Sequence, residues 1–182
     1  LNPTPSGRNS VSVPSLSALE RHDIKLSALL ITHGHEDHIG AIPHLWRALD
    51  CPIYASPFAA QLIRAKLDPG LTWPRLQEIR PLEPIGIGAF QAEWIPVTHS
   101  IPESHAIVLE VAGKRLYHSG DWKLDNHPVV GELTAQARLQ QLGRAGIDVI
   151  IGDSTNAPVP GASRSEATVQ NVLQDAIRPC RQ

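Results

Sequence analysis

The amino-acid sequence predicts an α/β layered domain in which helices cover a sheet. Short apolar runs at 27–32 and 51–56 have the length of buried strands, and the stretches 39–49 and 57–66 have helical spacing. A chain of 182 residues in which 42% are hydrophobic is long enough for one domain with a substantial core. Together these observations favour strands and helices that alternate along the chain.

Turn residues and periodicity place further elements along the chain. Residues 15–22 are expected to form a short helix with Ser15 or Ser17 as its N-cap. The other expected elements are a turn at 67–73, strands at 77–81 and 89–97 separated by a bend at 86–88, and a hairpin of strands 105–111 and 115–117.

The last third of the chain is expected to contain a helix, a strand and a second helix. The helix is predicted over 128–143 and closed by Gly143, and 146–151 is predicted to be a buried strand. The pattern from Ser163 to Glu166 is typical of a capping box, so a helix is expected to follow it. The apolar stripe of that helix consists of Val169, Val172, Leu173, Ala176 and Ile177.

Composition predicts a soluble, cytoplasmic protein with reduced cysteines. No apolar run approaches the roughly 18 residues that cross a bilayer, and no basic-then-apolar leader is present. Cys51 and Cys180 lie far apart and fit neither disulfide-framework nor metal-ligand spacing. The net charge of −2 gives no general attraction to nucleic acid. Residues 1–13, rich in Pro, Ser and Asn, are expected to form an irregular arm.

Metal-ligating residues gather directly after the first predicted strand, in the pattern H-x-H-x-D-H from His33 to His38. Neutral imidazole and carboxylate oxygen both suit Zn²⁺. His33 and His35 are two residues apart in extended backbone and point the same way, whereas Asp37 and His38 are expected to face an adjacent metal. The alternative is a polar loop whose histidines only form hydrogen bonds. That interpretation would be preferred for a single histidine, but the full H-x-H-x-D-H pattern favours a metal site.

Other predicted strands also end in polar residues that suit a metal site. His99 follows strand 89–97 as His33 follows strand 27–32, so it is a plausible third imidazole. Asp121 follows the second strand of the hairpin, and its two oxygens are able to bridge two cations. Asp153 follows strand 146–151. His118 is open to two interpretations: it orients a ligand, or it packs beside the strand end.

Four motifs together resemble the ribonuclease J family, which belongs to the β-CASP branch of the metallo-β-lactamase fold. The motifs are the H-x-H-x-D-H pattern and the segments 97–104, 118–125 and 152–157. The resemblance covers roughly residues 14–178. It is more specific than the metal motif alone, because H-S-I-P-[DE] and G-D-S-T-N-A are not shared by lactamases or glyoxalases at large.

The resemblance implies an αββα sandwich that is incomplete at the N-terminus and is cut before the β-CASP domain. Residues 14–153 would form part of the metallo-β-lactamase domain, and residues 154–182 would begin the β-CASP domain. His105 and His127 match no ligand of the family and are expected to be structural or surface residues. His22 and His44 are expected at the surface.

The resemblance also assigns roles to individual residues. His33, His35 and His99 would bind a first metal, Asp37 and His38 a second, and Asp121 would bridge the two. Asp37, His38 and Asp153 are the expected catalytic residues, with Asp153 paired to a later histidine that serves the leaving oxygen. Ser100, Glu103 and Ser154 are expected to contact substrate. Two Zn²⁺ ions are expected, although Mn²⁺ tolerates the same ligands.

The implied function is metal-dependent hydrolysis of RNA phosphodiester bonds by a hydroxide that two metals activate. The alternatives are a small-molecule metallo-hydrolase of the same fold and a catalytically silent fragment that binds metal or RNA. RNA is the expected partner, together with a second copy or missing domains of the same protein. The isolated chain is expected to be a poor RNA hydrolase, because substrate positioning in this branch depends on a cleft between two domains.

Overall fold

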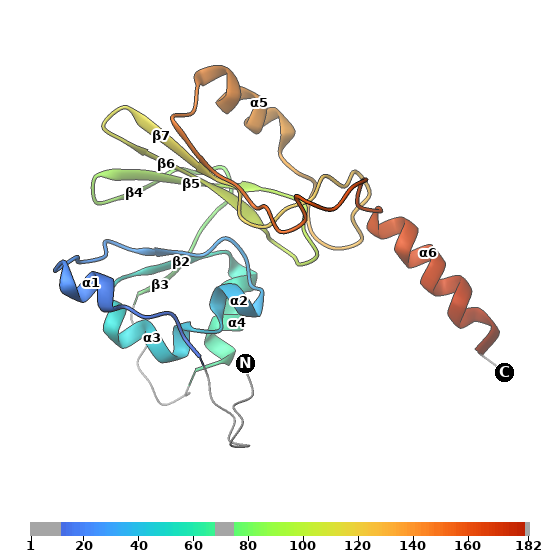
Figure 1. The fold of residues 1–182 in the computed structure, drawn as a ribbon, viewed down its shortest axis with the longest axis horizontal. Coiled ribbons are helices and arrows are strands. Elements are labelled where there is room, and N and C mark those ends of the chain that lie inside the picture. The colour runs from blue at the N-terminus through green and yellow to red at the C-terminus, as the bar shows by residue number, and fades with distance from the viewer. Residues whose placement is uncertain (1–11, 68–74, 181–182) are drawn as a thin grey trace.

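Two β-sheets lie one above the other in the computed structural model, with helices on their outer sides (Figure 1). The structure describes residues 12–67 and 75–180. Most of the predicted N-terminal arm and of the predicted turn at 67–73 lies outside the described residues. The order of layers is helix, sheet, sheet, helix, as the predicted αββα sandwich requires.

The smaller sheet contains three parallel strands in the order β1-β2-β3. The strands are β1 (Leu29–Leu30), β2 (Ile53–Ala55) and β3 (Leu76–Glu78). Parallel neighbours need crossover connections. Helices α3 (Ile42–Leu49) and α4 (Pro57–Ala65) provide them and cover the outer face of this sheet.

The larger sheet has the strand order β4-β5-β6-β7-β8, and only its last pair is parallel. Its strands are β4 (Ile85–Ile87), β5 (Phe90–Pro96), β6 (His105–Val111), β7 (Lys114–His118) and β8 (Val149–Ile151). The predicted hairpin is confirmed as β6 and β7. The bend predicted at 86–88 is wrong, because Ile85–Ile87 pairs with β5 and the chain turns at Gly88, whose φ is +58°.

Alternation of apolar side chains along the strands builds a core on each face of the larger sheet. Trp94 and Ile107 point inward and pack with Tyr54 of the smaller sheet. Ile95 and Val108, one residue further along, point outward and pack with Leu142 of α5 (Gln136–Ala145). A third cluster joins β2 to α3 and α4. The period-2 pattern therefore fixes which face of each strand meets which layer.

The N-terminal helices differ in their bounds from the sequence prediction. Helix α1 covers Ser17–Arg21, and its N-cap is Leu16 instead of Ser15 or Ser17. The helix predicted over 39–49 is two helices, α2 (Glu36–Ile39) and α3. Pro43 in the first turn of α3 fits a helix start and does not fit a helix interior. Asp37 and His38 therefore lie within α2 and not ahead of a helix.

The C-terminal elements depart further from the prediction. Residues 128–135 are not helical, and α5 runs past Gly143 to end before Gly146, whose φ is +90°. Helix α6 (Glu166–Ile177) follows N-cap Ser165 with no side-chain cap, so the predicted capping box at Ser163 is wrong. A short 3₁₀ helix, η1 (Arg178–Cys180), follows α6.

The predicted burial of β8 is wrong, and the apolar stripe of α6 is exposed as well. Val149, Ile150 and Ile151 are 49%, 68% and 47% exposed at the edge of the larger sheet. Helix α6 projects away from both sheets (Figure 1), and Val172 on its stripe is 57% exposed. Among the described helices, none has the length and hydropathy needed to cross a membrane.

Candidate metal centre

Two hydrogen bonds between the sheets place the loop that begins with His33. Trp94 Nε1 donates to the carbonyl of Ile31 at 2.9 Å, and the His105 backbone N–H donates to the carbonyl of Thr32 at 3.0 Å. Both donors belong to the larger sheet. Ile31 and Thr32 are therefore fixed against the larger sheet. The H-x-H-x-D-H motif, which follows them, lies near the ends of strands of that sheet.

His33 is fully buried and has one ring nitrogen without a partner. Its Nδ1 lies 3.0 Å from Thr32 Oγ1. In the tautomer that carries its proton on Nδ1, the ring donates this hydrogen bond and the Nε2 lone pair stays free. No described residue forms a hydrogen bond with Nε2. A buried polar atom without a partner is costly, and a metal ion would satisfy it.

Burial is also the main reason that His33 stays neutral. It lowers the pKa of His33 to about 3, and repulsion from the imidazoles of His38, His99 and His35 contributes in the same direction. Burial likewise lowers the pKa of His99, with repulsion from His35 as the next cause. Because only unprotonated imidazole binds a metal, both rings are prepared for ligation.

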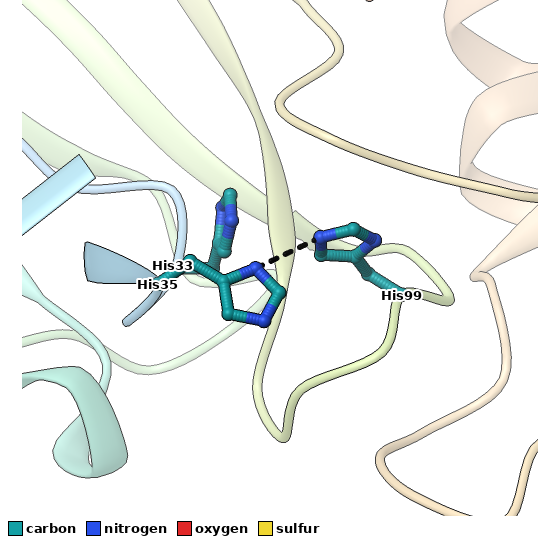
Figure 2. Close-up of side chains that lie close together, drawn as sticks. All are labelled: His33, His35 and His99. Atoms are coloured by element: carbon teal, nitrogen blue, oxygen red, sulfur yellow. Dashed lines mark hydrogen bonds between the residues drawn. The ribbon is translucent and has the colours of Figure 1, made fainter. Parts of the chain in front are cut away.

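Three imidazoles form the first donor group of the site. Figure 2 shows His33, His35 and His99 with their rings gathered at one point, although His99 comes from a different sheet. His35 Nδ1 and His99 Nε2 lie 3.1 Å apart, and the candidate ligand atoms of all three residues lie within 4.8 Å of one another. The structure thus brings together the three residues predicted for the first metal.

A second donor group shares His33 with the first. It consists of His33, His38 and Asp121, whose candidate ligand atoms also lie within 4.8 Å of one another. Asp121 Oδ2 lies 3.3 Å from His38 Nε2, 3.9 Å from His33 Nε2 and 4.0 Å from His99 Nε2. Asp121 therefore belongs to the second group and also lies 4.0 Å from His99 of the first group, as the predicted bridging role requires.

Asp37 lies at the outer side of the second group. Its side chain is 77% exposed, and its Oδ2 is 3.5 Å from His38 Nε2. Asp37 belongs to neither donor group. Its role as a ligand of a second metal stays a prediction.

A tight turn at Gly120 precedes Asp121. Gly120 has φ +59°, and a Cβ added there would lie 2.6 Å from the carbonyl oxygen of His105. Its N–H donates to His118 Nδ1 at 3.1 Å. Of the two interpretations of His118, the structure favours an orienting role, because its ring accepts a hydrogen bond from the turn that precedes Asp121. His118 itself belongs to neither donor group.

A cleft of about 620 Å³ opens beside the donor groups. Its lining includes His99 and Asp121 together with the predicted residues Ser100, Asp153 and Ser154. Asp153 Oδ1 accepts hydrogen bonds from the N–H and the hydroxyl of Thr155, at 2.9 and 2.7 Å. These bonds hold the pKa of Asp153 below its ordinary value, so the carboxylate is charged beside the site.

Most of the chain matches a protein family known from other proteins. A family model of the metallo-beta-lactamase superfamily matches residues 3–159. This chain belongs to that superfamily. Both donor groups lie within the matched residues, and each of them could hold a metal ion.

Curated relatives of this metallo-beta-lactamase chain are named Ribonuclease J. The chain is 38% identical over 167 residues to that of Sinorhizobium meliloti, covering 91% of this chain and 30% of the relative. It is 37% identical to that of Helicobacter pylori strain 26695, and the match covers 87% of this chain and 24% of the relative. It is 38% identical to that of Corynebacterium glutamicum, and this match covers 93% of this chain and 24% of the relative. The chain therefore spans less than a third of the length of these relatives.

Solved structures support the fold. A protein of unknown function from Enterococcus faecalis V583 aligns with a TM-score of 0.55 and 18% sequence identity. The alignment covers 83% of this chain and 38% of that one. At this level of identity the likeness concerns the metallo-beta-lactamase fold alone.

Glu103 has a structural contact in this metallo-beta-lactamase domain. Its Oε2 accepts a hydrogen bond of 2.8 Å from the backbone N–H of Phe58, in the first turn of α4. Its φ of +55° lies in the left-handed region. A carboxylate at a helix N-terminus satisfies a free N–H group and interacts well with the helix dipole. Contact of Glu103 with substrate stays a prediction.

Sequence reasoning missed several residues of the cleft. Trp122, Lys123 and Thr155 line it, and Trp122 is 43% exposed although it is a large aromatic. The available signal was position: these residues lie within the motifs at 118–125 and 152–157 that carried Asp121 and Asp153. A residue next to a ligand in a strand-end loop often faces the same site.

Proposed function

We propose that this chain is the metal-binding part of a ribonuclease that hydrolyses RNA phosphodiester bonds. The observation that carries the proposal is the pair of neighbouring donor groups around the buried His33, whose Nε2 has no hydrogen-bond partner among the described residues. The name Ribonuclease J of three relatives that match about nine-tenths of the chain supports RNA as the substrate class.

Two divalent ions fit these residues. His33, His35 and His99 would hold the first ion, and His38 with Asp37 would hold the second, with Asp121 between the ions. Such ions, when bound, acidify water and offset the negative charge that builds on phosphoryl oxygens. Nitrogen and oxygen donors favour Zn²⁺ and admit Mn²⁺.

The protein's own groups would orient the substrate. The cleft beside the donor groups presents the hydroxyls of Ser100 and Ser154, which are able to donate to phosphate oxygens. Asp153 lies in the same cleft, fixed by Thr155. We assign Asp153 to the leaving-group side, where it would orient the group that delivers a proton.

Cleavage of a 5′-monophosphorylated single-stranded RNA tests the proposal. The parent chain with Zn²⁺ or Mn²⁺ and protein in excess over RNA is compared with the Asp37→Ala/His38→Ala double variant. We expect slow, metal-dependent cleavage by the parent and none by the variant. Equal background in both proteins would contradict the proposal. Turnover of a lactam or thioester in place of RNA would favour a small-molecule hydrolase of the same fold.

A further inference from the structure

A buried carboxylate that belongs to neither donor group connects the loop of Asp121 to helix α6. The Asp125 side chain is 2% exposed. Its Oδ1 accepts a hydrogen bond from the His127 N–H at 2.9 Å, and its Oδ2 accepts one from the Glu166 N–H, the first residue of α6, at 2.8 Å. These bonds hold the pKa of Asp125 well below its usual range, so the group is charged. Lys123 Nζ lies 3.2 Å from Asp125 Oδ2 and balances that charge.

The Glu166 side chain, at the start of α6, bonds back to residues that follow the Asp121 loop. Its Oε2 accepts hydrogen bonds from the backbone N–H groups of Val129 and Val130, at 2.8 and 3.2 Å. Its Oε1 lies 3.4 Å from Lys123 Nζ. Asp125, Lys123 and Glu166 therefore form one ionic network, which we call the latch. The side chains of Lys123 and Glu166 are 23% and 17% exposed, so solvent screens the network only in part.

The latch is attached to the metal-ligand residues on its other side. The Lys123 N–H donates to the carbonyl of Thr98 at 2.9 Å, and the Thr98 hydroxyl is 3.5 Å from the carbonyl of Asp125. Thr98 directly precedes the ligand His99. The Ser104 hydroxyl donates to the carbonyl of Asp121 at 3.3 Å. Segment 121–125 thus contains the candidate ligand Asp121, contacts the residue before His99, and reaches the start of α6.

The rest of α6 lacks comparable support among the described residues. The helix extends away from the two sheets (Figure 1), and its side chains beyond the first turn are exposed. Its direction is therefore set at its first residues. The start of α6 follows the segment 153–163, of which residues 153–157 and 161–163 line one wall of the cleft, while residues 121–124 line another. Asp125 and Glu166 of the latch lie next to these two lining segments in the chain.

We propose that Asp125 is a positioning residue that fixes α6 and the wall 153–163 of the cleft relative to the metal-ligand loop. It touches neither substrate nor metal and acts through Lys123 and Glu166. The consequence for metal binding rests on the proposed function, whereas the consequence for α6 does not. Asp148 supplies a matched control, because it also accepts a lysine Nζ and a backbone N–H, from Lys114 and Arg115, away from the cleft.

Spin-label distances test the position of α6. One nitroxide is attached to Cys180, which is exposed whereas Cys51 is buried, and another to Gln140→Cys on α5. We expect a narrow distance distribution in the parent and one roughly twofold broader in Asp125→Asn, because the variant loses the ion pair with Lys123 and one of the two acceptor oxygens. Glu166→Gln, a milder change, is expected to broaden it too. Asp148→Asn is expected to leave it unchanged.

Each outcome of this experiment decides the proposal. A narrow distribution in both Asp125→Asn and Glu166→Gln, with native circular dichroism, would overturn it. Equal broadening in Asp148→Asn would overturn it as well, because any lost carboxylate would then loosen the fold. Zn²⁺ titration forms the second arm: Asp125→Asn is expected to weaken the site that contains Asp121 roughly tenfold. A parent that binds no Zn²⁺ would refute the proposed function and leave the distance result for α6 standing.

Discussion

His38 Nε2 lies 3.3 Å from Asp121 Oδ2, although 83 residues separate the two in the chain. His38 lies in α2, beside the smaller sheet, and Asp121 lies in the loop after β7 of the larger sheet. The second donor group therefore exists only when the two sheets are packed in the observed orientation. Ligand geometry at this site depends on the hydrogen bonds and turns that join the sheets.

The turn at Gly120 gives the first prediction. Gly120→Ala adds a Cβ that would lie 2.6 Å from the His105 carbonyl oxygen, at φ +59°. Gly113→Ala is the matched control, with φ +73° and no atom within 4 Å of the added Cβ. We expect Gly113→Ala to cost about 1 kcal/mol of unfolding free energy and Gly120→Ala about 1 to 3 kcal/mol more, measured by urea unfolding. Equal losses would show that the close approach at Gly120 is absent.

Substitution of Glu103 distinguishes its structural role at the start of α4 from its predicted role in binding substrate. Because it accepts the Phe58 N–H, Glu103→Ala is expected to lower the unfolding free energy by about 1 kcal/mol, and Glu103→Gln by less. Zn²⁺ affinity should not change in either variant. Unchanged stability together with weaker RNA binding would instead establish Glu103 as a substrate-binding residue.

His105 gives a pH-dependent prediction. Burial lowers the pKa of His105 below the ordinary 6.5, so the unfolded chain binds a proton at higher pH than the folded chain does. The stability that the neutral ring contributes is present above pH 6.5 and is lost as pH falls below that value. Its slope is at most about 1.4 kcal/mol per pH unit.

Urea unfolding of metal-free protein between pH 7 and 5 measures this slope. His105→Phe keeps a buried ring and removes the titration, so its stability is expected to fall less steeply than that of the parent. His33 titrates alike in both proteins and cancels in the comparison. Parallel curves would mean that His105 has an ordinary pKa in the folded state.

Strand-end patterns predicted the first donor group well, for a physical reason. An apolar run that stops at a polar residue marks the edge of a sheet, and such edges bring His33 and His99 together even though they lie in different sheets. The same logic predicted Asp121 at the shared edge. This reasoning did not predict helix α2, because Glu36–Ile39 is too short to show a helical period.

Apolar periodicity also failed to predict burial near the C-terminus. Periodicity indicates which face of a strand or helix is apolar, but it does not indicate whether another element packs against that face. Ile150 and Val172 therefore follow the pattern of core residues and are nevertheless exposed. Residues 128–135 had helical spacing, yet tertiary contacts prevailed there: Thr134 Oγ1 accepts the Thr98 N–H at 2.9 Å. Gly131 at φ +83° is likewise incompatible with a helix.

Titration of metal-free protein with Zn²⁺ tests the central claim most directly. We expect two unequal steps, the tighter from the three imidazoles of His33, His35 and His99. We also expect His33→Ala to weaken the tighter step by more than about 100-fold, because a direct ligand matters more than an outer-shell residue. His44→Ala, on the exposed side of α3, is the control and should titrate like the parent. Absence of Zn²⁺ binding by the parent, or equal affinity in His33→Ala and His44→Ala, would contradict the account.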